Sequence, residues 1–141
     1  MTMHFRYKLQ ERKNHGNVYA PCIPLTFSGK QKLTSVALID SGADTPVISR
    51  DFAELLELDL RGKKQDVAGI GGTVKGTLSK VSVKIEKGHD RVVFQMPVWV
   101  LDDFNNNPLL GREVFFDKFN IKFQQNEKKF ILSPTSSRAG R

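Results

Sequence analysis

Asp40, Ser41 and Gly42 place an acid, a hydroxyl and a glycine directly after the apolar residues 37–39 (Ala-Leu-Ile). Such a run predicts a buried strand that delivers the Asp40 carboxylate at its end. Two carboxylates about 3 Å apart cannot both ionise, so they share a proton and act as base and acid. Asp-Ser-Gly occurs once in this 141-residue chain. The hypothesis is therefore a homodimer that assembles two copies of Asp40 around one water.

The neighbours of Asp40 fit the same chemistry. Gly42 lets the backbone approach its partner closely, and the Ser41 hydroxyl can hydrogen-bond across to hold the two loops. The alternative is an ordinary acid at the end of a strand, because Asp-Ser-Gly also occurs by chance.

A glycine-rich segment follows later in the chain. Gly69, Ile70, Gly71 and Gly72 are flanked by β-branched residues, which predicts a hairpin tip that approaches something closely. Over an active site it would be a lid that excludes water and holds an extended peptide. The alternatives are a simple turn and a phosphate-binding loop. No Lys-Ser/Thr follows the glycines, which disfavours phosphate.

Arg112 ends the segment Leu109-Leu110-Gly111-Arg112. Two apolar residues and a glycine place its guanidinium where it can pair with a carboxylate, and Asp44 is the natural partner. The alternative is the start of a helix with a surface arginine.

The remaining pattern predicts one mainly β domain over residues 1–132, a small barrel or sandwich with one or two short helices. Residues 133–141 are small, polar and basic, and we expect them to form a disordered tail. Ser49 is an expected N-cap of a helix over 49–58, with Leu55 and Leu56 on its buried face. Strands are expected at 3–10, 18–27, 33–39, 78–85, 92–101, 121–123 and 130–132, and a second short helix at 114–119.

Composition limits the class of protein. Cys22 is the single cysteine, so no internal disulfide can form. No apolar run reaches membrane-spanning length, and the first residues lack the apolar core of a secretion signal. We therefore expect a cytoplasmic protein without membrane association. His4, His15 and His89 are far apart in sequence, and we predict no metal.

The chain is basic, with a formal net charge of +7 and a pI near 9.7. The lysines and arginines are scattered and mostly alternate with apolar residues or lie in turns, which is typical of a solvated strand face. We expect no nucleic acid partner. A basic surface can still attract acidic substrates over long range.

Taken together, the three motifs in their order resemble the retropepsin-like aspartic proteases, the single-domain relatives of pepsin that include retroviral proteases. The resemblance spans Val36 to Phe123. It implies a closed β-barrel of the acid-protease type and an obligate homodimer. It also implies hydrolysis of peptide bonds by an activated water, with no cofactor, metal or covalent intermediate.

By the resemblance, Asp40 matches the catalytic aspartate, and Ser41 and Gly42 match the rest of the active-site triplet. Ala43 and Asp44 match positions that hold the main chain of the substrate. The flap corresponds to Gly69, Ile70, Gly71 and Gly72, and the arginine that braces the loop and the dimer corresponds to Arg112. Glu113 and Ser41 depart from the residues common in viral members, and the helix over 49–58 is more like cellular or bacterial members.

Substrate pockets are expected between the flap, the first helix and residues 46–48, and would favour apolar side chains beside the cleaved bond. Two other classes stay open. One is a binding module that keeps the fold without useful proteolysis. The other is a nucleic-acid-binding β-barrel, which predicts a steep dependence of affinity on salt.

Overall fold

The computed structural model describes residues 1–12, 14, 16–69 and 71–136. The helices are α1 (Arg50–Leu55), α2 (Phe115–Lys118) and the 3-10 helix η1 (Gln125–Glu127). The strands are β1 (Met3–Arg6), β2 (Lys8–Arg12), β3 (Gly16–Ala20), β4 (Cys22–Ser28), β5 (Lys32–Ile39), β6 (Val47–Ser49), β7 (Lys64–Gly69), β8 (Gly72–Lys87), β9 (Asp90–Leu101), β10 (Leu109–Leu110), β11 (Phe119–Gln124) and β12 (Lys129–Pro134).

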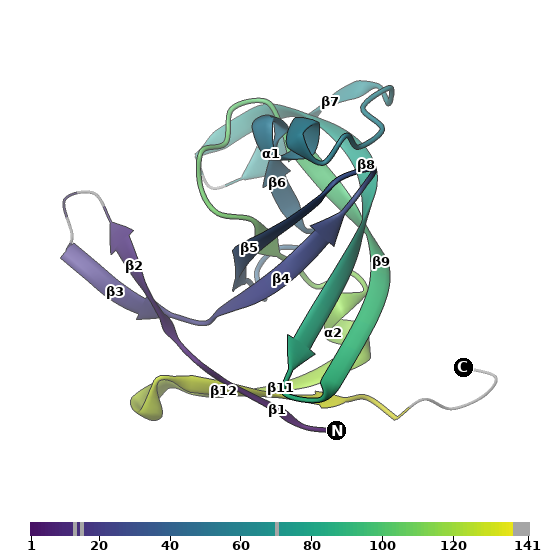
Figure 1. Ribbon diagram of the computed structural model, residues 1–141. Helices are drawn as coiled ribbons and strands as arrows, with labels where there is room; N and C mark the ends of the chain where they lie inside the picture. The colour runs from purple at the N-terminus through teal and green to yellow at the C-terminus, as the bar shows by residue number, and fades with distance from the viewer. Residues whose placement is uncertain (13, 15, 70, 137–141) are drawn as a thin grey trace.

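The largest sheet closes on itself. Its strand order is β4-β5-β10-β6-β9-β8-β7, and β4 also pairs with β8. That second pairing joins Thr26 to Lys84 and Ser28 to Ser82. It closes a ring of strands in the order β4, β5, β10, β6, β9 and β8 (Figure 1). β7 extends beyond the ring as a hairpin with β8. The expected mainly β, closed fold with short helices is confirmed.

Alternation along the ring strands builds the core. In β8, Val81, Val83 and Ile85 are buried while Lys80 and Glu86 are exposed, which is the period of a strand with one face inward. The many phenylalanines pack together inside. Phe115 of α2 is fully buried, and its ring lies 6.4 Å from Phe94 and 5.4 Å from Phe119 between centroids. Aromatic packing thus attaches α2 to the ring.

Two smaller sheets lie outside the ring. One has the order β1-β12-β11, and the other is the hairpin of β2 and β3, which projects from the body of the molecule (Figure 1). The single strand expected over 3–10 is therefore wrong. It breaks at Tyr7, whose amide donates to the Lys128 carbonyl at 2.8 Å, and its two halves join different sheets.

The C-terminal boundary also differs from the expectation. Ser133 and Pro134 belong to β12, and the Thr135 hydroxyl donates to the Asp117 carbonyl at 2.7 Å. The tail expected from residue 133 is therefore wrong for these three residues, because pairing with β11 continues past Leu132. Residues 137–141 lie outside the described part of the chain.

Helix α1 begins as expected but ends early. The Ser49 hydroxyl accepts a hydrogen bond from the Phe52 amide at 3.1 Å, so the predicted N-cap is confirmed. Glu57 has a φ of 55°, which stops the helix before residue 58. Leu56 is buried, but Leu55 is 63% exposed and its expected place on the buried face is wrong. Within the described ranges, no helix is long and apolar enough to cross a membrane.

Candidate active site

The Asp40 loop is held by the two strands that lie beneath it. β5 pairs in parallel with β10, with Ile39 opposite Leu110. The Asp40 amide then donates to the Leu110 carbonyl at 3.1 Å, which extends the ladder by one residue. These bonds place the Asp40 backbone at the end of a buried strand, as the apolar run predicted.

The Asp40 carboxylate is oriented by its own loop. The Gly42 amide donates to Asp40 Oδ1 at 2.9 Å, and the Ala43 amide donates to the Asp40 carbonyl at 3.2 Å. This is an Asx turn, in which an aspartate side chain caps the amide two residues later. Asp40 is half-buried, whereas Ser41 and Gly42 are exposed. The carboxylate therefore lies at the surface of the chain.

The segment after β10 braces this loop. The Arg112 amide donates to the Ala43 carbonyl at 2.8 Å, and the Glu113 amide donates to the Asp44 carbonyl at 2.8 Å. Arg112 Nη1 donates to the Ser41 carbonyl at 2.6 Å, and Nη2 forms an ion pair with Asp44. The predicted contact between Arg112 and Asp44 is confirmed. Three residues of one loop, Ser41, Ala43 and Asp44, are thus fixed by two adjacent residues that lie about 70 positions later in the sequence.

Thr45 is a member of the site that the sequence analysis missed, and the contacts of Gly111 with the Asp40 loop were not predicted either. A Cβ on Gly111 would lie 2.8 Å from the Thr45 carbonyl carbon and 2.9 Å from the Ala43 oxygen, so only glycine fits. The Thr45 hydroxyl donates to the Glu113 carboxylate. The position of Gly111 immediately before Arg112 was a signal for close approach. Nothing in the sequence joins Thr45 to Glu113.

Replacing Arg112 by lysine tests the brace. The Arg112 and Asp44 side chains are 49% and 80% exposed, so their ion pair contributes little, and the hydrogen bond to Ser41 contributes more. Because lysine lacks the planar fork, we expect Arg112→Lys to lower the free energy of unfolding by about 1 kcal/mol in urea titration. Arg91→Lys, at an exposed position, is the control. Equal stability of both variants would contradict the brace.

The predicted hairpin of glycines is confirmed. β7 pairs with β8 up to Gly69 opposite Gly72, and Gly72 has a φ of 118° that favours glycine. Gly71 is exposed, and Ile70 lies outside the described residues. Among the described residues, no hydrogen bond joins the hairpin tip to the Asp40 loop. One protomer therefore brings together Asp40 and Arg112 but does not attach the hairpin to them.

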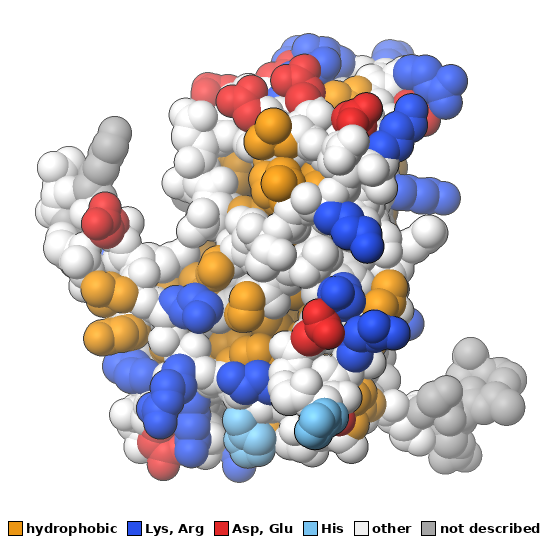
Figure 2. Space-filling model, viewed as in Figure 1, with side chains coloured by type: hydrophobic (Ala, Val, Ile, Leu, Met, Phe, Trp, Pro, Cys, Tyr) orange, Lys and Arg blue, Asp and Glu red, His pale blue; other side chains and the backbone are white. Residues whose placement is uncertain are grey.

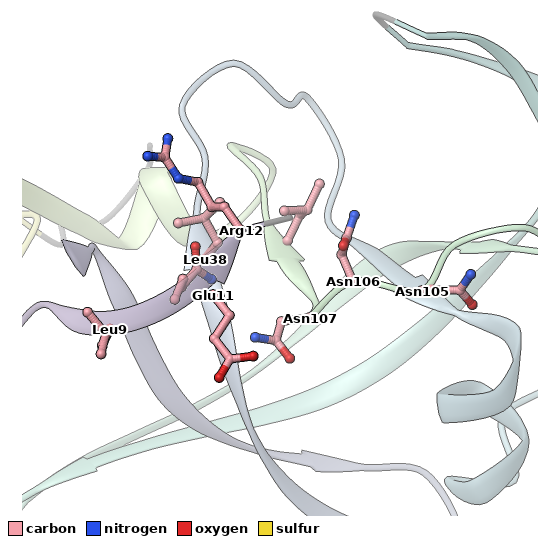
Figure 3. Close-up of a pocket in the computed structure, with 9 residues that line it drawn as sticks. Leu9, Glu11, Arg12, Leu38, Asn105, Asn106 and Asn107 are labelled. Carbon is pink, nitrogen blue, oxygen red and sulfur yellow. The ribbon is translucent and has the colours of Figure 1, made fainter. Parts of the chain in front are cut away.

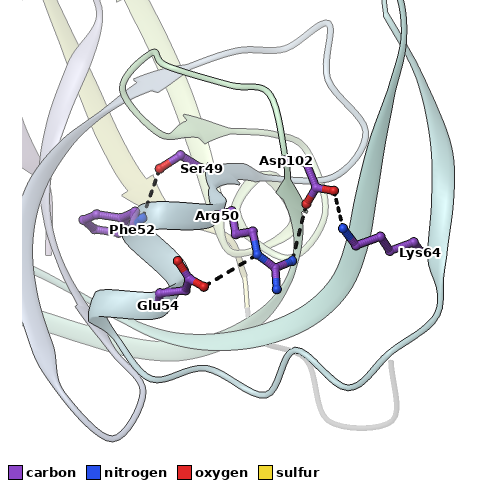
Figure 4. A network of polar contacts seen from close by, with 6 residues as sticks. All are labelled: Ser49, Arg50, Phe52, Glu54, Lys64 and Asp102. Carbon is purple, nitrogen blue, oxygen red and sulfur yellow. Dashed lines mark hydrogen bonds and ion pairs between the residues drawn. The ribbon is translucent and has the colours of Figure 1, made fainter.

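The base of this hairpin is fixed by Asp102, which follows β9. Lys64 Nζ donates to Asp102 Oδ2 at 2.5 Å, and Arg50 of α1 lies 3.4 Å from Oδ1 (Figure 4). Arg50 also lies 3.6 Å from Glu54, and the Asp102 amide donates to the Lys75 carbonyl at 2.9 Å. Asp102 thus links both strands of the hairpin to α1. No sequence signal marks this network, because its members are distant in the chain.

The network predicts a dependence of stability on pH. The hydrogen bond from Lys64, with the charge of Arg50, holds the pKa of Asp102 below its usual value. Because its pKa is lower in the folded state, the ionised carboxyl adds to the stability of the fold at pH values above its ordinary pKa of about 4. This added stability is lost as the pH falls through the pKa of the folded state. Asp102→Asn should therefore be less stable than the parent at about pH 6, with the gap closing near pH 2. Thermal unfolding over this pH range measures the stability of the variants. Asp103→Asn, at the exposed neighbouring position, is the control. A gap that persists in acid would contradict the assignment.

A cavity of about 920 Å³ opens beside the strands that carry the Asp40 loop. Leu9 of β2, the paired Leu38 and Leu109, and the loop Asn105–Asn107 line it (Figure 3). Residues 46–48 were expected to line substrate pockets. Ile48 is instead fully buried in the protomer core, because β6 lies between β9 and β10. That expectation is wrong for Ile48, and the open apolar surface near the site comes from Leu38 and Leu109.

Comparison with known proteins identifies the family of the chain and proteins with a similar fold. A model of the family described as aspartyl protease matches residues 23–114. A retropepsin-like aspartic protease from Rickettsia conorii has a similar fold, with 17% identity and a TM-score of 0.61, over 92% of this chain and 98% of that one. The EIAV protease in complex with the inhibitor HBY-793 matches over 72% of this chain and 86% of that one, with 23% identity and a TM-score of 0.44. No curated protein matches the sequence. The family match covers more than half of the chain, including the Asp40 loop and Arg112, and the chain therefore belongs to the aspartyl protease family.

Proposed function

We propose that the protein is a homodimeric aspartic endopeptidase. The observation that carries the proposal is the Asp40 loop, whose carboxylate is oriented by the Gly42 amide and whose backbone is braced by Arg112. Asp40 and the partner's Asp40 bind one water between them. One carboxylate accepts a proton from that water while the other donates a proton to the carbonyl oxygen of the scissile bond. The water oxygen bonds to the carbonyl carbon to give a tetrahedral intermediate. This intermediate collapses when the C–N bond breaks, and the carboxyl group that took the proton from water passes a proton to the amine nitrogen that leaves.

Rigid support of the carboxylate is what this chemistry needs. A general base must be held within hydrogen-bond distance of the proton it removes, and a small displacement is costly to the rate. The Asx turn fixes Asp40 Oδ1, and the backbone hydrogen bonds from the amides of Arg112 and Glu113 leave the loop little freedom. The exposure of Ser41 and Gly42 leaves room for the same loop of a second protomer.

The substrate would bind in an extended conformation. The hairpin of β7 and β8 acts as a flap, and the glycine backbone at Gly69, Gly71 and Gly72 adds main-chain hydrogen bonds to the peptide. Ala43 and Asp44 hold the substrate main chain from the opposite side. Apolar side chains flanking the cleaved bond are favoured.

The test is cleavage of a diverse peptide library from about pH 3 to pH 8, read by mass spectrometry over a series of protomer concentrations. We expect cuts at bonds with apolar neighbours, and a specific activity that rises with protomer concentration because two chains build one site. Activity that is independent of concentration, in a chain shown to be monomeric by sedimentation, would exclude the shared dyad. Absence of cleavage by an assembled dimer would instead indicate a binding module.

A further inference from the structure

The outer edge of β1 is a free strand edge. In the order β1-β12-β11, β1 has one neighbour among the described residues, with Phe5 opposite Phe130 and Arg6 opposite Lys129. The Tyr7 amide donates a hydrogen bond to the Lys128 carbonyl. In an antiparallel pair, the backbone N–H and C=O groups of every second residue face the same neighbouring strand, so those of Phe5 also face β12. The N–H and C=O groups of His4 and Arg6 therefore point away from β12, toward the open side.

A basic groove of about 490 Å³ runs along this strand. Among the described residues, its lining contains no carboxylate and consists of His4, Phe5, Arg6, Tyr7, Lys8, Pro24, Lys87 and Lys129. Figure 2 shows blue lysine and arginine side chains gathered with histidines at the lower end of the molecule, where Figure 1 places β1 and β12. The groove therefore combines a concentration of positive charge with an unpaired strand edge.

This arrangement carries a cost to folding. Arg6 and Lys129 lie directly opposite each other in the antiparallel pair, and like charges in such positions destabilise a sheet. Lys129 is partly compensated by Glu127 at 3.2 Å, and Lys87 lies 5.2 Å from the centroid of the Phe5 ring. No ion pair of Arg6 or Lys8 occurs among the described residues. An acidic ligand would remove the repulsion.

We propose that this groove binds an acidic, extended segment of a partner protein, which adds to β1 as a further strand. The backbone of His4 and Arg6 supplies main-chain hydrogen bonds, and the cationic side chains pair with carboxylates of the added strand. A second copy of this chain is disfavoured because it presents the same positive charge. A single-stranded nucleic acid is disfavoured because Phe5 and Tyr7 are only 5% and 6% exposed, which leaves no aromatic surface for base stacking.

The test is fluorescence anisotropy with a labelled peptide of alternating Glu and Val. A peptide of alternating Gln and Val is the neutral control, and an oligothymidylate is the nucleic acid probe. Measurement in an Asp40→Asn background prevents cleavage of the peptides and makes the result independent of the proposed activity. We expect the acidic peptide to bind at least about tenfold more tightly than the neutral one, with an affinity that falls as salt is added.

Arg6→Gln should weaken binding of the acidic peptide about tenfold, as expected for loss of a charge-assisted hydrogen bond. Lys80→Gln, an exposed lysine of β8 outside the groove, should leave it unchanged. Because Arg6→Gln removes a like-charge pair, its resistance to urea should equal or exceed that of the parent. An Arg6→Gln variant that resists urea as well as the parent is folded, so unfolding cannot be the cause of its weaker binding.

Hydrogen exchange identifies the mode of binding. Addition of the acidic peptide should protect the amides of His4 and Arg6, which face the open edge. Equal affinity for acidic and neutral peptides, or equal weakening by Arg6→Gln and Lys80→Gln, would overturn the proposal. Tighter binding of oligothymidylate without protection of these amides would also overturn it, and would assign the groove to nucleic acid.

Discussion

Asp40→Asn should reduce peptide cleavage by about a thousandfold or more, because asparagine can neither accept nor donate the proton that the reaction moves. The fold should survive the change. The Gly42 amide donates to Asp40 Oδ1 at 2.9 Å, and an asparagine carbonyl oxygen accepts the same bond. Cleavage rates with a substrate from the library, together with the urea midpoint, measure both effects. Asp117→Asn, at an exposed position in α2, should change neither.

A mixing experiment distinguishes a shared dyad from a site contained in one chain. If each active site needs Asp40 from two protomers, about a tenfold excess of the Asp40→Asn chain captures most parent chains in inactive pairs. Activity per parent chain should then fall about tenfold by statistical exchange. Asp117→Asn added in the same excess should cause no loss. An Asp40→Asn chain that leaves parent activity intact after full exchange, or that cleaves as well as the parent, would refute the mechanism.

Gly111→Ala should have the second large effect, on stability and activity together. The added Cβ would meet backbone atoms of Ala43 and Thr45 at 2.8–2.9 Å, and backbone cannot move aside as a flexible side chain can. We expect the free energy of unfolding to fall by about 2 kcal/mol. The loop that must shift carries Asp40, and a displacement of about 1 Å can reduce the rate about a hundredfold.

Gly71→Ala is the matched control for this change. A Cβ at Gly71 has no heavy atom within 4 Å, and the residue is exposed. Its free energy of unfolding in urea should match that of the parent to within about 0.5 kcal/mol. If Gly111→Ala were as stable as Gly71→Ala, the close approach of β10 to the Asp40 loop would not hold in solution.

The features that could be predicted from sequence depend on short-range patterns. The apolar run before Asp40 specifies a buried strand and the loop at its end. Ser49 caps a helix because its hydroxyl accepts from an amide three residues away. The pair Gly69 and Gly72 forms a hairpin because glycine tolerates the backbone angles of a tight turn. The contact between Arg112 and Asp44 was also predicted, because two apolar residues and a glycine before Arg112 place its guanidinium where a carboxylate can pair with it.

Tertiary structure decided the features that depend on which distant segments meet. The alternation of apolar and polar residues over 3–10 fits one strand as well as two. Only the tertiary packing assigns β1 to the sheet with β12 and β11, and β2 to the projecting hairpin with β3. Pairing of β4 with β8 closes the ring, and no local signal specifies that register. The contacts of Gly111 with Ala43, and of Asp102 with Arg50 and Lys64, follow from that closure. A single chain specifies each strand locally, but close approach between strands depends on the whole set of pairings.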